Sequence, residues 1–223
     1  MMKNSNYTQR LENIIKQMLQ PLKDVPFNLV IETLSGRKVI RFNDEEPEHK
    51  ETLEILKRVA RKTSVLINKE GISRNRPNEV GNDIETFVKK AFTDLKIKKD
   101  TPSTTKNRKK ATGYPDIIFW VKNKPYYLEC KTFNKKNLNT TQRSFYLSPS
   151  DEFKVIYDTI HFCLSFEMER KTKRNKSVFI CKSFKILSLE ELSMDLKFEF
   201  NSDNKRLYSN LDGAKILYEE NLI

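Results

Sequence analysis

The sequence predicts an α/β protein, because helix-type and strand-type patterns dominate different parts of the chain. Up to residue 95, most apolar residues recur at the three- and four-residue spacing of amphipathic helices. From residue 113 onward, short runs rich in β-branched and aromatic residues alternate with polar turns. The chain has 223 residues, of which 37% are hydrophobic. It is therefore long enough for one domain with a sizeable core.

Residues 1–72 are expected to form a mainly helical N-terminal region. The apolar spacing predicts one helix over residues 6–20 and a second from about Glu46-Pro47 to residue 68. Between them, residues 27–31 and 38–42 have the composition of two short strands. None of these segments contains an evident site.

A third helix is expected within residues 73–95, and it carries candidate acidic residues. Glu85 borders the apolar stripe of this helix, beside Ile84 and Val88. Its carboxylate could therefore reach a site on a sheet that the helix packs against. Most helix glutamates are simply solvated, so this interpretation stays open. Glu79, one to two turns earlier, belongs to the same region.

The central feature is the stretch GYPDIIFWVKNKPYYLECK, residues 113–131. Its two β-rich runs are separated by a polar turn, which predicts a hairpin that brings Asp116 beside Glu129 and Lys131. Glu129 and Lys131 are two residues apart, so they point to the same face of a strand. Carboxylates this close repel each other unless a cation or a proton lies between them. Oxygen ligands with no neighbouring His or thiol favour a hard cation, and Mg²⁺ is the one expected here. The alternative is a surface hairpin with solvated charges, and spacing alone leaves both open.

The formal net charge of +12 favours a polyanionic partner, above all nucleic acid. Positive residues cluster at 106–110 and at 170–176. The first cluster lies in an aperiodic segment, residues 96–112, which is expected to be a basic loop leading into Asp116. A loop of this kind suits a phosphate-bearing substrate. An ordinary connector remains the alternative.

The second half of the chain predicts further short elements. A short helix is expected from Pro149-Ser150-Asp151 to residue 160, strands at 161–166 and 177–187, a helix at 188–194 and a strand at 196–200. The sequence contains no apolar run long enough to span a bilayer, and its N-terminus lacks the apolar core of a signal peptide. A cytoplasmic location is therefore expected. Each cysteine lies in an apolar run, which favours buried free thiols at Cys130, Cys163 and Cys181.

The ordered pieces RPNEVGNDIE, GYPDI, YLECK and FYLSPSDEFK resemble a type II restriction endonuclease of the PD-(D/E)xK nuclease superfamily. The resemblance covers about residues 74–166. It implies a restriction-endonuclease-like core, a mixed β-sheet flanked by helices, with the helical N-terminal region as an extension. One nuclease domain would then span residues 1–223, with a catalytic core at 73–200 and a C-terminal tail at 201–223.

The resemblance also implies roles for individual residues. Asp116 and Glu129 would hold Mg²⁺ together with the main-chain carbonyl of Cys130. Lys131 would orient the attacking water or help to deprotonate it. Glu85 would be an outer or second-metal ligand, with Glu79 as the alternative outer acid. The products would carry 5′-phosphates and 3′-hydroxyls.

The implied substrate is double-stranded DNA, cut on both strands by a homodimer. A cognate DNA methyltransferase is the expected genetic partner. The residues expected to contact DNA are Lys106, Arg108, Lys109, Lys110, Gln142 and Arg143. Two other interpretations stay open at this point: a structure-specific repair or junction-resolving nuclease with the same core, and a non-catalytic DNA-binding protein.

Overall fold

The computed structural model describes residues 5–20, 22–74, 79–110, 112–140, 144–147, 152–173 and 176–197, together with Ser202, Leu217 and Glu220. The chain divides into two compact units, which are described separately. One comprises residues 26–193, and the other comprises residues 1–25 and 194–223. No helix among the described residues is long and apolar enough to cross a membrane.

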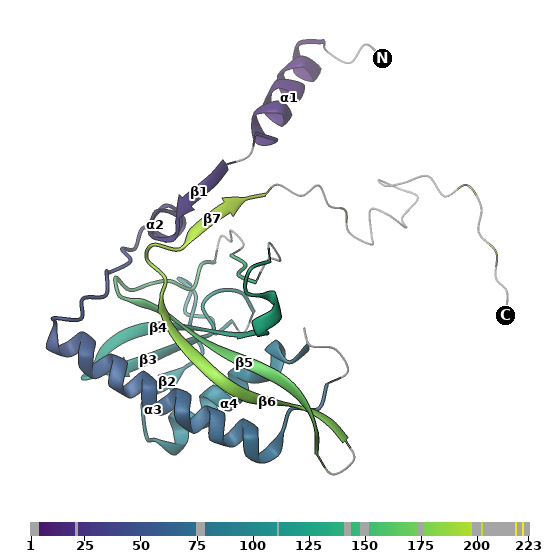
Figure 1. The fold of residues 1–223 in the computed structure, drawn as a ribbon. Helices are drawn as coiled ribbons and strands as arrows, with labels where there is room; N and C mark the ends of the chain where they lie inside the picture. The colour runs from purple at the N-terminus through teal and green to yellow at the C-terminus, as the bar shows by residue number, and fades with distance from the viewer. Residues whose placement is uncertain are drawn as a thin grey trace. The chain divides into compact units, whose positions relative to one another are not determined.

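The larger unit is built on a mixed five-stranded sheet (Figure 1). Its strand order is β2-β3-β4-β5-β6, in which only β4 and β5 run parallel. The strands are β2 (Lys99–Asp100), β3 (Ile117–Val121), β4 (Lys124–Phe133), β5 (His161–Lys173) and β6 (Lys176–Ser188). The predicted α/β fold with a mixed sheet is confirmed.

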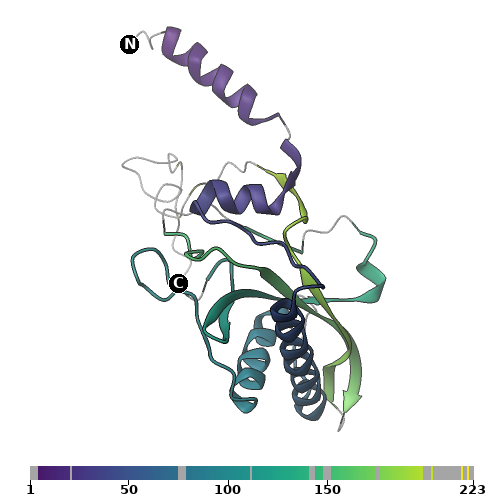
Figure 2. The same ribbon diagram turned by 90° about the vertical axis from the view of Figure 1, so that its left-hand side faces the viewer.

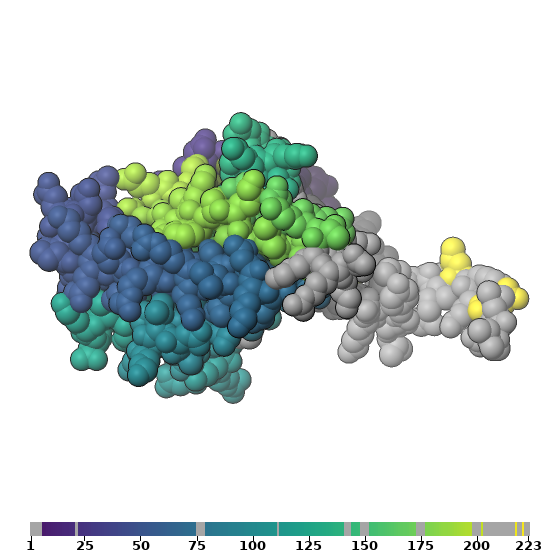
Figure 3. Space-filling model, turned by 60° about the horizontal axis from the view of Figure 1, so that its bottom comes forward, coloured from purple at the N-terminus to yellow at the C-terminus, as the bar shows by residue number. Residues whose placement is uncertain are grey.

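Two helices cover one face of this sheet. Helix α3 (Pro47–Glu70) packs on β6, and α4 (Gly81–Asp94) packs on β4, with the two helices against each other (Figure 2). In the space-filling view, α3 forms a continuous band between β6 and α4 (Figure 3). Alternation along β4 directs Tyr126, Leu128 and Cys130 into the core shared with these helices. Tyr127, Glu129 and Lys131 therefore point to the opposite face.

The opposite face is covered in part by an aromatic cluster. Phe27, at the start of helix α2 (Phe27–Ser35), contacts the rings of Tyr114, Phe145 and His161 at centroid distances of 5.5–5.9 Å. His161 is completely buried, and its Nδ1 atom lies 2.5 Å from the hydroxyl of Tyr114. Burial lowers the pKa of His161 to about 3, so the ring is neutral. It packs in the core and does not face a substrate.

The predicted hairpin is present, and so are the helices predicted at 46–68 and within 73–95. The hairpin forms with Val121 paired to Lys124, as expected for a two-residue turn. The helix expected at 46–68 is α3, and the one expected within 73–95 is α4. Cys130, Cys163 and Cys181 are buried free thiols, as predicted.

Four short elements differ from prediction. Residues 27–31 belong to a helix, because Phe27 and Ile31 lie four apart and are both completely buried. Residues 38–42 contain no strand, only a bridge from Val39 to Thr159. Within the expected helix at 149–160, residues 152–160 are irregular. Their main chain bonds to neighbouring side chains instead, for example from Ile156 N–H to the Tyr127 hydroxyl at 2.8 Å.

The expected helix at 188–194 is also wrong. The chain makes a turn there, with Leu192 N–H donating to the carbonyl of Leu189. It then enters β7 (Ser193–Leu196). In the smaller unit, α1 (Ser5–Met18) matches the first predicted helix, and β1 (Leu22–Pro26) pairs with β7 in a two-stranded sheet.

Candidate active site

The hairpin brings the two candidate carboxylates close together. Pairing between β3 and β4 starts with Ile117, which pairs with Leu128. Asp116 is the residue immediately before Ile117, and Glu129 is the residue immediately after Leu128. The charge of Asp116 acts on Glu129, as expected for neighbouring acids.

Asp116 is held by a main-chain donor. Its Oδ2 atom accepts a 2.8 Å hydrogen bond from the N–H of Cys130. Burial raises the pKa of Asp116, and the charge of Glu85 raises it further, while the hydrogen bond from Cys130 acts in the opposite direction. The net shift is upward, so the negative charge of Asp116 is only partly compensated.

Glu129 is the most deeply buried acid of the site, with 4% of its surface exposed. Its Oε1 atom accepts a 2.6 Å hydrogen bond from Lys131 Nζ. Its Oε2 atom is buried and has no hydrogen-bond partner in the described part of the chain. Burial and the charge of Asp116 raise the pKa of Glu129 to about 7. A buried carboxylate oxygen without a partner is costly, and a bound cation would remove that cost.

Lys131 supplies a positive charge beside these acids. Burial lowers the pKa of Lys131, but the charge and the hydrogen bond of Glu129 outweigh burial, and the net shift is upward. Its Nζ atom also lies 5.4 Å from the centroid of the Phe145 ring. Lys131 is therefore a fixed ammonium group at neutral pH.

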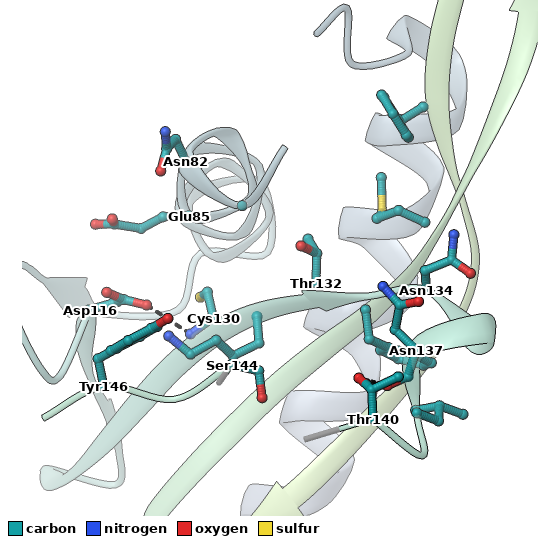
Figure 4. Close-up of a pocket in the computed structure, with 16 residues that line it drawn as sticks. Asn82, Glu85, Asp116, Cys130, Thr132, Asn134, Asn137, Thr140, Ser144 and Tyr146 are labelled. Carbon is teal, nitrogen blue, oxygen red and sulfur yellow. Dashed lines mark hydrogen bonds between the residues drawn. The ribbon is translucent and has the colours of Figure 1, made fainter. Parts of the chain in front are cut away.

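The structure separates the two candidates for the outer acid. Glu85, on α4, lines the same pocket as Asp116 (Figure 4). It also forms an ion pair with Lys89. Glu79 precedes α4 and is not among the lining residues. Its charge acts instead on Arg74, which pairs with Asp83.

The pocket has a volume of about 680 Å³, and its lining changes character from end to end. Asp116 and Glu85 lie at one end, where the hydrogen bond between Asp116 and Cys130 is drawn (Figure 4). Amide and hydroxyl side chains line the other end, among them Asn134, Asn137 and Thr140. Lys131 and several apolar side chains, among them Phe133 and Met168, complete the lining.

The donor set fits a hard divalent cation. Two neighbouring carboxylates with raised pKa values and one buried oxygen without a partner favour binding of positive charge. Across the described residues, no three His, Cys, Asp or Glu side chains form a metal-binding group. A third protein ligand would therefore come from the main chain, such as the carbonyl of Cys130, and not from another of these side chains. The Cys130 thiol is unsuitable because burial raises its pKa well above the ordinary value, which keeps it protonated.

The basic loop is exposed, and two of its four positive residues already have acidic partners. Lys106 pairs with Glu152 at 3.0 Å, and Lys109 pairs with Asp100 at 2.7 Å. Arg108 is exposed, whereas Lys110 is half-buried. Gln142 and Arg143 lie outside the described residues.

No sequence pattern identified Lys154 as a residue near the site. This lysine is 2% exposed, and its ammonium donates hydrogen bonds to main-chain carbonyls just before Asp116. It lies within the run FYLSPSDEFK, but lysines are rarely buried, and no local pattern marks this one.

Comparison with known proteins gives two matches that agree. A family model described as the Type II restriction enzyme MjaV family matches residues 21–211. The chain is 37% identical over 237 residues to the type II restriction enzyme MjaV of Methanocaldococcus jannaschii, and the alignment covers 99% of the chain and 100% of that protein. No solved structure matches the chain.

Proposed function

Since the chain belongs to the Type II restriction enzyme MjaV family, and is therefore a restriction endonuclease, we propose that it uses the PD-(D/E)xK mechanism. It hydrolyses phosphodiester bonds of double-stranded DNA at a defined sequence, with Mg²⁺ as cofactor. The products carry 5′-phosphates. The observation that carries this proposal is that Oε2 of Glu129 is buried without a hydrogen-bond partner among the described residues. The charge of Asp116 acts on this carboxylate, and Lys131 donates to its other oxygen.

Asp116 and Glu129 would hold the metal, with the main-chain carbonyl of Cys130. A bound Mg²⁺ would stabilise charge on the scissile phosphate and lower the pKa of its water. Glu85, which lines the same pocket, is the better candidate for the outer acid.

Lys131 contributes through its charge. The charge and the hydrogen bond of Glu129 raise the pKa of Lys131, which favours its ammonium form in the metal-free protein. An ammonium group orients a water by hydrogen bonding and stabilises negative charge as it develops on the phosphate. This favours an orienting role over that of a general base.

The exposed loop at 106–110 supplies contacts to backbone phosphates, which fix the position of the duplex without reading its sequence. Cutting both strands of a symmetric target requires two sites related by a two-fold axis, so the active form is a homodimer. A methyltransferase that modifies the same sequence protects the host DNA in such a system.

Digestion of a sequenced phage genome with Mg²⁺, followed by mapping of the ends, tests this function. We expect discrete fragments with 5′-phosphates, and no cleavage in EDTA. The matched variant Asp116→Ala should retain DNA binding and lose cleavage. Cutting confined to branched or mismatched DNA would instead indicate a structure-specific nuclease. If the wild-type protein cuts no DNA with Mg²⁺, the catalytic proposal is wrong.

A further inference from the structure

Lys154 is a buried ammonium group whose donors are directed at one loop. Its Nζ atom donates to the carbonyl oxygens of Lys110 at 3.2 Å, Pro115 at 2.5 Å and Gly113. These are as many acceptors as an ammonium group has protons. The side chain is therefore fixed in place.

All three acceptors belong to the segment that ends at Asp116. Carbonyl dipoles that converge on one point repel each other, so their arrangement depends on a positive charge at that point. Pro115, which accepts one of the bonds, is the residue next to Asp116. Lys154 therefore fixes the main chain before Asp116, while the N–H of Cys130 fixes its carboxylate.

The ammonium group of Lys154 is buried, which is unusual for a lysine. Burying an ammonium group is costly unless other charges compensate it. Within the described part of the chain, its hydrogen bonds go to neutral carbonyls and not to a carboxylate. Burial lowers the pKa of Lys154, and the charges of Asp116, Glu129 and Glu85 oppose that shift. The compensating charges are thus those of the candidate active site.

We propose that Lys154 is a positioning residue for the nuclease. It holds the main chain at Lys110, Gly113 and Pro115 so that the Asp116 carboxylate lies beside Glu129 in the geometry that a divalent cation requires. The inference rests on the proposed function, because it assigns Lys154 to the metal site formed by those two acids.

The test compares Lys154→Met with Lys122→Met. Methionine has a similar length and no charge. Lys122 is exposed at the turn of the same hairpin and pairs with Glu51, so it serves as a matched control outside the site. Mn²⁺ binding is measured by calorimetry on DNA-free protein, and circular dichroism at the same temperature verifies folding. We expect Lys154→Met to bind Mn²⁺ at least about tenfold more weakly, as for other residues that orient metal ligands. Lys122→Met should match the wild type.

Cleavage gives a second readout. The Mg²⁺ concentration for half-maximal cleavage should rise with the loss of Mn²⁺ affinity, while DNA binding in EDTA stays close to the wild-type value. If Lys154→Met does not fold, Lys154→Gln replaces it. Its amide has only two donors for the three carbonyls and carries no charge, so Mn²⁺ affinity should still fall.

The possible outcomes separate the two proposals. Unchanged Mn²⁺ affinity in a folded Lys154 variant overturns the positioning role. Tighter binding also overturns it, since the ammonium would then act only by repelling the metal. Asp116→Asn is measured in parallel: if it binds Mn²⁺ as well as the wild type does, the metal site itself is wrong. If Asp116→Asn loses the metal and the Lys154 variant does not, only the inference about Lys154 fails.

Discussion

Lys131 Nζ donates a 2.6 Å hydrogen bond to Oε1 of Glu129, two residues earlier on the same strand. The pair lies on the face of β4 opposite α3 and α4, and the bond occupies only one of the two carboxylate oxygens of Glu129. Lys131 therefore orients Glu129 through Oε1 and leaves Oε2 without a hydrogen-bond partner among the described residues.

Replacing Lys131 with Met tests its part in the reaction. We expect the single-turnover cleavage rate at saturating Mg²⁺ to fall by about 10²-fold or more, the range for loss of one group that stabilises transition-state charge. Lys124→Met is the control, because Lys124 lies at the other end of β4 and pairs with Glu48. Equal rates for the two variants would exclude a catalytic role for Lys131.

The pKa of Glu129 predicts an unusual dependence of stability on pH. Burial and the charge of Asp116 raise that pKa from 4.5 to about 7. The folded state then binds the proton more tightly than the unfolded state does. This stabilisation is fully present below pH 4.5 and is lost as the pH rises through about 7.

Unfolding by denaturant in EDTA measures this effect. Glu129→Gln lacks the titrating group and serves as the reference. Between pH 4.5 and pH 7, the free energy of unfolding of the wild type should fall by roughly 1–3 kcal/mol relative to this variant. Added Mg²⁺ should raise the free energy of unfolding of the wild type above pH 7. It should not raise that of Glu129→Gln. Parallel pH profiles for the two proteins would show that Glu129 has an ordinary pKa.

The outer acid can be identified with two single substitutions. Glu85→Gln should lower the cleavage rate by about tenfold or more, because Glu85 shares the pocket of Asp116. Glu79→Gln should change the rate by less than about twofold, since Glu79 lies outside that lining, near Arg74. Both rates are measured at saturating Mg²⁺ on the same DNA. The reverse order would assign the outer acid to Glu79.

The hairpin was predictable because its register follows from local features. A two-residue turn with positive φ at Lys122 and Asn123 fixes which residues pair. Once the pairing is fixed, the two-residue period of the strand determines that Glu129 and Lys131 share a face, and the start of β3 at Ile117 brings Asp116 close to them. Helix α3 was predictable for a similar reason, because a long apolar period lies between Pro47 and Gly71.

Elements that depend on distant contacts were not predictable in the same way. Residues 27–35 are short and apolar, and their pattern is compatible with either a strand or a helix. The contacts of Phe27 with Tyr114 and His161 favour the helix, and no local signal reveals them. Lys154 is a similar case, because its acceptors lie about 40 residues earlier in the chain.

The basic loop gives a prediction about DNA affinity. Arg108 is exposed, whereas Lys106 and Lys109 must give up the ion pairs with Glu152 and Asp100 to reach a phosphate. Arg108 should therefore contribute the most. Arg108→Ala should weaken binding of a labelled duplex in EDTA and reduce the slope of log affinity against log salt by about 1.

The control for this measurement is Arg41→Ala, since Arg41 is an exposed arginine paired with Glu191 outside the loop. Both variants lose one positive charge, so a general effect of net charge would change the two slopes equally. A direct contact between Arg108 and a phosphate changes only the slope of Arg108→Ala, because the counterions are released from the phosphate that the side chain neutralises. Equal slopes for the two variants would place the DNA away from residues 106–110.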